Sequence, residues 1–76
     1  MKGLGFIGAG NMAEAMIRGI LSAKLVPADK LFVLDVRADR TEGLRKRFGV
    51  TVSTDLTGMI QACETIVFAV KPQTVP

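Results

Sequence analysis

The chain has 76 residues, of which 49% are hydrophobic and 22% are charged, and its formal net charge is +3. A chain of this length forms one domain at most, and a domain of this size buries only about 60% of the surface that its unfolded chain exposes. The longest apolar runs, over 31–34 and 65–70, are much shorter than the roughly 20 residues that a membrane-spanning helix needs. We therefore expect a globular protein without a membrane partner.

The residue inventory also excludes several kinds of chemistry. A single cysteine, Cys63, cannot form an internal disulfide, and without histidine the chain can assemble neither a zinc site nor a Cys/His nucleophile. Half of the ten Lys and Arg residues lie in one short segment, as Arg37, Arg40, Arg45, Lys46 and Arg47. Because no aromatic residue interleaves with them, this cluster favours a solvated helix face over a nucleic-acid interface. We expect no metal and place Cys63 in the core.

The first elements follow directly from the amino terminus. Leu4, Phe6 and Ile7 form a short apolar run that predicts a strand over 3–7, and apolar side chains then recur at helical spacing over about 10–24. Only two residues precede this strand, which leaves no room for a secretory signal peptide, so a cytoplasmic location is expected.

The turn between this strand and helix carries a glycine pattern. Residues 8–13 read GAGNMA and fit G-x-G-x-x-[G/A], in which Gly8 allows a tight turn and Gly10 lets the backbone approach a pyrophosphate. Ala13 fills the third position, which keeps helix and strand close. A helix that begins near Gly10 also points its first N–H groups and the positive end of its dipole at the space above the strand. The surrounding strand and helix favour a diphosphate site here over a turn that binds nothing.

The second strand, over 31–34, is apolar at every position, as a central parallel strand covered on both faces should be. Asp35 follows it at about the spacing from Gly10 at which dinucleotide-binding folds place a carboxylate on the adenosine ribose. Taken alone, Asp35 favours NAD, whereas Arg37 and Arg40 could bond the 2′-phosphate of NADP. A cap or turn residue is the alternative role for Asp35, and the sequence leaves both cofactors open.

The pattern continues with a helix over about 39–48, which Gly49 ends in a left-handed conformation, and with a short strand over 50–52. Ser53 or Thr54 is expected to cap a third helix. The face of this helix that is expected to point inward carries Leu56, Met59, Ile60 and Cys63.

A fourth strand over 65–70 completes the predicted α/β fold. Strands that alternate with helices imply right-handed crossovers and a parallel sheet, here a partial Rossmann-type doubly wound sheet with the strand order 3-2-1-4. In that order the carboxyl ends of strands one and four flank the crevice where such sheets bind ligands, so the glycine turn and residues 69–72 are expected to meet there. A plain strand terminator is the alternative role for Lys71-Pro72.

Two motifs, GFIGAGNMA at residues 5–13 and FAVKPQ at residues 68–73, resemble the amino-terminal part of the pyrroline-5-carboxylate reductase family. With the interval between them, the similarity covers essentially the whole chain. It implies an NAD(P)-binding Rossmann domain over 1–76, whose remaining strands lie beyond this chain. The cofactor-binding residues that the resemblance implies are Ile7, Gly8, Ala9, Gly10, Asn11, Met12, Asp35, Arg37, Ala69, Val70, Lys71 and Pro72.

The resemblance further implies the NAD(P)H-dependent reduction of 1-pyrroline-5-carboxylate, a cyclic imine, to L-proline, with NADP as the expected cofactor and NAD as the alternative. Members of the family continue with a helical domain that forms a homo-oligomer and most of the imine site. We therefore expect no catalytic residue in these 76 residues, and an inactive fragment. The alternatives are a 3-hydroxyacid dehydrogenase of the 6-phosphogluconate type and a non-catalytic module that senses dinucleotides.

Overall fold

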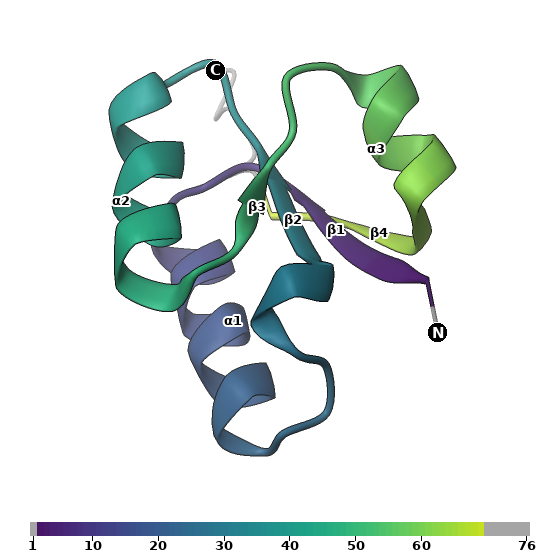
Figure 1. Ribbon diagram of the computed structural model, residues 1–76. Helices are drawn as coiled ribbons and strands as arrows, with labels where there is room; N and C mark the ends of the chain where they lie inside the picture. The colour runs from purple at the N-terminus through teal and green to yellow at the C-terminus, as the bar shows by residue number, and fades with distance from the viewer. Residues whose placement is uncertain (1, 70–76) are drawn as a thin grey trace, which may run out of the picture.

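The computed structural model describes residues 2–69 and shows a parallel sheet with helices on both faces (Figure 1). Strands and helices alternate along the chain, as the sequence predicts. The elements are β1 (Gly3–Ile7), α1 (Asn11–Ser22), a 3-10 turn (Ala28–Lys30), β2 (Leu31–Leu34), α2 (Ala38–Phe48), β3 (Thr51–Val52), α3 (Leu56–Ala62) and β4 (Cys63–Phe68). None of the helices among residues 2–69 has the length and apolar character that a bilayer crossing requires.

The sheet has the order β3-β2-β1-β4, which confirms the predicted doubly wound arrangement. Phe6 in the middle of β1 lies opposite Val33 of β2 on one side and Val67 of β4 on the other. After β1 the chain first builds β2 and β3 on one side and then returns to place β4 on the other. The carboxyl ends of β1 and β4 therefore border the point where the direction of winding reverses, which is where sheets of this kind bind ligands.

The helices α1 and α2 cover one face of the sheet, and α3 covers the other (Figure 1). The main core lies on the first face, where Phe6, Leu31 and Val33 from the strands meet Ile17 of α1 and Leu44 of α2. Burying a large aliphatic or aromatic side chain stabilises the fold by about 1.5–3 kcal/mol, so this layer supplies most of the driving force.

Close approach explains a glycine in the central strand. A Cβ atom at Gly5 would lie 3.0 Å from the Sδ and Cγ atoms of Met59 and 3.1 Å from the Sγ atom of Cys63. Glycine therefore lets α3 and the start of β4 pack directly on the backbone of β1. Cys63 is buried, as predicted, and burial raises the pKa of its thiol.

The helix α1 ends two residues earlier than the sequence predicts. Its last residue is Ser22, and Lys24 adopts a left-handed conformation with φ 56°. The N–H of Leu25 donates to the carbonyl of Ile20 at 3.1 Å, and the N–H of Lys24 donates to that of Leu21 at 3.1 Å. This pair of bonds is the Schellman motif, which closes the last turn of a helix.

The predicted cap of the third helix is wrong. Residue 55 precedes α3 without a side-chain capping bond, and Ser53 still belongs to the extended chain because its N–H donates to the carbonyl of Val33 at 2.8 Å. The predicted inner face also differs. Met59 is buried, but Leu56 and Ile60 are exposed, and Cys63 begins β4 because the helix is only seven residues long.

The fourth strand is shifted toward the amino terminus relative to the prediction. It runs over Cys63–Phe68 instead of 65–70, and the N–H of Ala69 extends the pairing by donating to the carbonyl of Ile7 at 2.8 Å. The predicted last residue of the strand, Val70, lies outside the described residues.

The helix α2 ends as the sequence predicts. Gly49 follows its last residue with φ 76°, which confirms the predicted left-handed cap.

Candidate functional site

A cleft of about 1040 Å³ lies at the carboxyl edge of the sheet. Its size is at the upper end of the range for pockets that bind small molecules and cofactors. Its walls come from the β1–α1 turn, the β2–α2 connection, the start of α3 and the end of β4. The lining residues are Ile7, Gly8, Gly10, Asn11, Met12, Leu34, Asp35, Val36, Arg37, Arg40, Thr54, Asp55, Leu56 and Ala69.

The glycine turn has the geometry that its first glycine was expected to provide. Gly8 has φ 108°, a conformation that residues with a side chain rarely adopt, and its N–H donates to the carbonyl of Leu34 at 2.8 Å. The turn is therefore tied to the end of β2 as the chain leaves β1. Ala13, the third position of the pattern, is fully buried, which agrees with its predicted role of keeping helix and strand close.

The second glycine is open toward the cleft. Gly10 is the residue before α1, with φ −88° and ψ −161°, an extended conformation that any residue adopts. A Cβ atom there would lie 3.7 Å from the Nη2 atom of Arg37, its nearest neighbour from elsewhere in the chain, which is ordinary van der Waals contact. Neither backbone strain nor crowding by the protein therefore requires a glycine at this position.

The start of α1 presents backbone donors to the same cleft. The N–H groups of the first helical turn, from Asn11 to Ala13, have no partner within the helix, and the preceding residue supplies no side-chain cap. Asn11 and Met12 line the cleft. With the positive end of the helix dipole behind them, these groups favour an anion at this position.

The carboxylate of Asp35 is the centre of a hydrogen-bond network. Its Oδ2 atom accepts from the N–H of Ala9 at 2.7 Å and from Nη2 of Arg37 at 2.8 Å. Its Oδ1 atom accepts from the backbone N–H of Arg37 at 2.9 Å and from Nε of the same residue at 3.0 Å. These bonds to Arg37 hold the pKa of Asp35 far below its ordinary value, although desolvation opposes the shift. The carboxylate in turn raises the pKa of Arg37.

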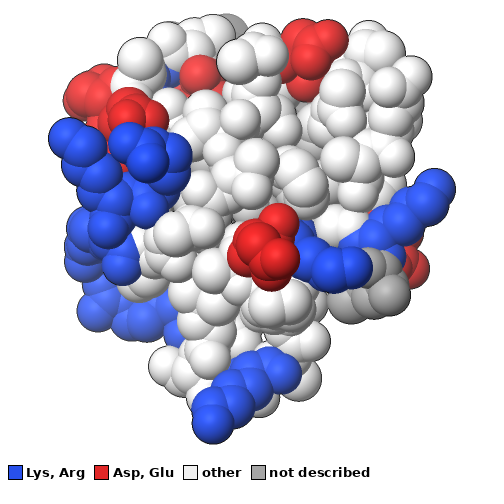
Figure 2. Space-filling view, viewed as in Figure 1, with Lys and Arg blue, Asp and Glu red and all other residues white. Residues whose placement is uncertain are grey.

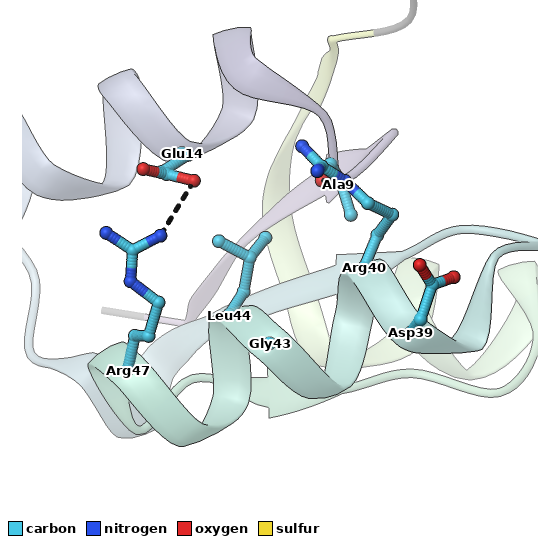
Figure 3. Close-up of a pocket in the computed structure, with 7 residues that line it drawn as sticks. All are labelled: Ala9, Glu14, Asp39, Arg40, Gly43, Leu44 and Arg47. Carbon is cyan, nitrogen blue, oxygen red and sulfur yellow. Dashed lines mark hydrogen bonds and ion pairs between the residues drawn. The ribbon is translucent and has the colours of Figure 1, made fainter.

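A second arginine reaches the turn from α2. The Nε atom of Arg40 donates to the carbonyl of Ala9 at 3.2 Å, and its Nη2 atom donates to Oδ1 of Asn11 at 3.3 Å. Figure 3 shows Arg40 extending from the helix to the backbone of Ala9. The β1–α1 turn is therefore connected by charged side chains both to the end of β2 and to α2.

A smaller cavity of about 140 Å³ lies between α1 and α2 (Figure 3). Glu14 of α1 forms ion pairs with Arg47 of α2 at 3.1 Å and with Arg18 at 2.8 Å, and Leu44 points toward α1 beside them. The carboxylate already has two cationic partners, so this cavity is accounted for by an ion-pair bridge that joins the two helices.

The basic residues within 37–47 form much of the charged surface along α2. Figure 2 shows the blue side chains along the edge of the molecule that carries α2, whereas the surface over α3 is mostly uncharged. Three of these arginines pair with carboxylates: Arg37 with Asp35, Arg45 with Glu42, and Arg47 with Glu14. Such pairing is typical of a solvated helix face.

Most of the predicted cofactor-binding residues within the described range line the cleft, whereas Ala9 is buried beneath it and contributes hydrogen bonds. The predicted residues Val70, Lys71 and Pro72 lie outside the described residues. Within residues 2–69, no group of three or more carboxylate or thiol side chains converges as metal ligands would.

Sequence reasoning missed one wall of the cleft. Thr54 and Asp55 line it from the β3–α3 connection, and Leu56 lines it from the start of α3. This connection follows the carboxyl end of β3, and in a parallel sheet all such ends meet at one edge. The position of the connection in the predicted strand order was therefore the signal that could have identified this wall.

The chain matches the model of the protein family described as NADP oxidoreductase coenzyme F420-dependent over residues 3–76. It is 35% identical over 71 residues to a pyrroline-5-carboxylate reductase of Methanosarcina acetivorans, which covers 93% of this chain and 26% of that protein. It is 34% identical over 74 residues to pyrroline-5-carboxylate reductase 2 of Bacillus subtilis, covering 96% and 27% of the two chains. The corresponding values for the Arabidopsis thaliana enzyme of that name are 31% over 72 residues, 95% and 26%.

The predicted resemblance to the amino-terminal part of these reductases is thereby confirmed. The chain spans about a quarter of the length of the curated relatives that it matches.

Proposed function

Because the chain belongs to the family described as NADP oxidoreductase coenzyme F420-dependent, we propose that it is the NAD(P)H-binding part of a pyrroline-5-carboxylate reductase. The complete enzyme would reduce the cyclic imine 1-pyrroline-5-carboxylate to L-proline by hydride transfer. The name shared by the relatives supports this substrate over that of a 3-hydroxyacid dehydrogenase. We also propose that the rest of the enzyme forms the imine site and the homo-oligomer contacts, and that the enzyme is cytoplasmic.

The observation that carries the proposal is the open backbone at Gly10. The fold itself has room for a side chain at this position, since the nearest neighbour of a Cβ atom would be an exposed arginine at 3.7 Å. A glycine that the protein does not need is explained when a ligand occupies the space, and the second glycine of the pattern is the position where a pyrophosphate approaches the backbone. The donors at Asn11 and Met12 suit that diphosphate.

Apolar side chains on two walls of the cleft support a seat for the adenine ring. Val36 is 99% exposed although it is a β-branched apolar residue, and Leu56 is also exposed. Both line the cleft, one from the β2–α2 connection and the other from the start of α3. A flat aromatic base between them would cover apolar surface that otherwise faces water.

The network around Asp35 supports NADPH as the cofactor. A carboxylate disfavours a nearby 2′-phosphate, but here Arg37 neutralises it through two side-chain bonds. A guanidinium group carries five N–H donors, so donors that Asp35 does not use remain on the exposed Arg37 for a phosphate. Charge-assisted bonds of this kind are stronger than bonds between neutral groups.

In the reaction the bound cofactor would supply the hydride. The residues of this chain would hold the pyrophosphate at the start of α1, seat the adenosine end beside β2, and thereby position the nicotinamide near the carboxyl ends of β1 and β4. Positioning of this kind can supply a large part of an enzymatic rate enhancement. The imine and its proton donor would be held by parts of the enzyme outside this chain.

The replacement Gly10→Val tests the pyrophosphate site. We expect it to abolish dinucleotide binding in a fluorescence titration while circular dichroism shows the secondary structure unchanged, since the new side chain would occupy the space of the pyrophosphate. Gly19→Val is the matched control, because Gly19 lies in α1, the helix that follows Gly10, with no neighbour within 4 Å of a Cβ atom. Unchanged affinity in a folded Gly10→Val chain would refute the site.

The replacement Arg37→Ala tests the choice of cofactor. We expect NADPH binding to weaken by about 1–3 kcal/mol more than NADH binding, the range for hydrogen bonds to a charged group. Arg45→Ala is the control, since Arg45 also pairs with a carboxylate but does not line the cleft. An equal loss for both cofactors would show that Arg37 does not contact the 2′-phosphate.

The proposed reductase activity of the complete enzyme is tested in a separate assay. We expect the complete gene product to form proline from 1-pyrroline-5-carboxylate with NADPH, and the isolated 76-residue chain to form none. Turnover by the purified short chain would show that the division of labour proposed above is wrong.

A further inference from the structure

The peptide groups on either side of Ala9 are held by charged side chains from two other elements. The N–H of Ala9 donates to Oδ2 of Asp35 at 2.7 Å, and its carbonyl accepts from Nε of Arg40 at 3.2 Å. The side chain of Ala9 is buried in the core. The residue between the two glycines of the turn is therefore fixed by its donor, its acceptor and its side chain at once.

The carboxylate that holds the N–H has no acceptor position left. An ionised carboxylate has about four lone-pair sites, and Asp35 accepts four hydrogen bonds, one from Ala9 and three from Arg37. Its side chain is only 6% exposed. A ribose hydroxyl could bond this carboxylate only by displacing a donor. Displacing the N–H of the buried Ala9 leaves a buried donor unpaired, which is costly, and displacing any donor of Arg37 breaks a bond to an ionised carboxylate.

From this geometry we infer that Asp35 and Arg40 are positioning residues that fix the shape of the phosphate-binding turn, and that Asp35 does not read the ribose hydroxyls. The inference rests on the proposed function, because the turn is taken to hold a dinucleotide. Asp35 acts in two directions. It turns the Ala9 N–H away from the ligand, which leaves the diphosphate to the donors at the start of α1, and it anchors the guanidinium of Arg37 beside Gly10.

Arg40 has the complementary role on the other side of the turn. It ties the carbonyl of Ala9 and the side chain of Asn11 to α2. Its effect is therefore expected on the turn as a whole, without preference for one cofactor, whereas Asp35 also controls the group that would meet a 2′-phosphate.

Replacement of Asp35 by alanine separates this inference from the usual role of a carboxylate at the end of β2. If Asp35 reads the ribose, Asp35→Ala weakens NADH, and NADPH binds as well as before or better because a repelling charge is gone. If Asp35 is a positioning residue, both cofactors bind more weakly, by about tenfold for the loss of a hydrogen bond to a charged group. NADPH then loses more affinity than NADH, because Arg37 has lost its anchor, and equal losses in a folded variant would overturn this role.

The experiment is a titration of NADPH and NADH against the complete gene product, followed by nicotinamide fluorescence, for the unaltered protein and for Asp35→Ala, Arg40→Ala and Arg45→Ala. We expect Arg40→Ala to weaken both cofactors by the same factor and Arg45→Ala to change neither. The ratio of the two affinities is the decisive readout, since a general loss of folded protein would leave it unchanged. If Asp35→Ala does not fold, Asp35→Asn serves with a different expectation: it retains one oxygen for the Ala9 N–H but loses the charged acceptor of Arg37. The positioning role then predicts a weaker affinity for NADPH alone, whereas a ribose-reading role predicts a weaker affinity for NADH.

Two outcomes distinguish the inference from the proposed function. Binding of neither dinucleotide by the folded, unaltered protein would overturn the proposed function and the inference with it. Binding by the unaltered protein, together with a shift of the affinity ratio toward NADPH in Asp35→Ala, would leave the proposed function in place and overturn the inference alone.

Discussion

The two sides of the sheet differ in how completely they are packed. On the side of α1 and α2, Phe6, Ile17 and Leu31 are fully buried, and the interhelical surface is joined by the ion pair of Glu14 with Arg47. On the side of α3, one residue of the helix, Met59, is buried.

Exposed apolar side chains occur around α3 and β4 on the second side, in addition to Met12, Leu25 and Val36 elsewhere. Leu56 and Ile60 of α3 and Phe68 at the end of β4 all face solvent among residues 2–69. The β1–α1 turn, Asp35 and the two arginines that contact them, Arg37 and Arg40, therefore belong to the well-packed half of the molecule. The phosphate end of the proposed site is therefore supported by a rigid layer, as binding groups need to be.

The largest expected difference between the two halves is in the free energy of unfolding. Ile17→Ala should lower it by about 2–5 kcal/mol, because a fully buried side chain leaves a cavity. Ile60→Ala, at a residue that is 54% exposed, should change it by less than about 0.5 kcal/mol. Urea denaturation of both variants makes the comparison.

Because a small domain has little stability to lose when a core residue is truncated, Ile17→Val provides the milder variant, with an expected loss of about 0.5–1.5 kcal/mol. A cost for Ile60→Ala as large as that for Ile17→Ala would show that the two halves are equally packed in solution.

A smaller effect is expected from the charge that joins the turn to the well-packed half. Asp35→Asn should lower the free energy of unfolding at pH 7 by about 1–2 kcal/mol, since it removes a charged acceptor from the bonds with Arg37. The folded-state pKa of Asp35 is depressed, so its contribution is present above the unfolded-state pKa of about 3.9 and is lost as the pH falls below it.

The difference between the unaltered chain and Asp35→Asn should therefore shrink steadily below about pH 4. Glu42 is the matched control, because its pKa is also lowered by an arginine, Arg45, but the pair is exposed. The measurement is a set of urea titrations over a pH series. If Glu42→Gln lowered the free energy of unfolding as much as Asp35→Asn does, the bonds of Asp35 at the turn would contribute no more than an exposed ion pair.

The smallest expected effect is a gain in stability. Lys24 has φ 56° at the end of α1, and it is the non-glycine residue with positive φ among residues 2–69. Lys24→Gly should raise the free energy of unfolding by about 0.5–1 kcal/mol, because glycine adopts this conformation without the Cβ clash. Thermal unfolding measures the change, and Ser22→Gly inside the helix, which should destabilise, is the control. A lower melting temperature for Lys24→Gly would show that the lysine side chain contributes more than the strain costs.

The sequence by itself determined the strand order and the tight turn. Alternating apolar strands and amphipathic helices imply parallel crossovers, and the glycines at positions 8 and 49 indicate a backbone with positive φ. These features could be predicted because each signal is local and depends on one residue or one period. Both glycines have positive φ. The sequence also placed Asp35 at the end of β2, where it lies.

Only the tertiary structure decided what these residues bond to. The partners that fix Ala9 lie 26 and 31 residues away along the chain, and a carboxylate that has filled its acceptor positions looks the same in a sequence as one that is free to meet a ribose. The cap and the inner face of α3 depended in the same way on where β3 ends and how short the helix is. Spacing along the chain predicts which groups come near one another, but the sharing of hydrogen bonds among them depends on distances of tenths of an ångström, which packing alone sets.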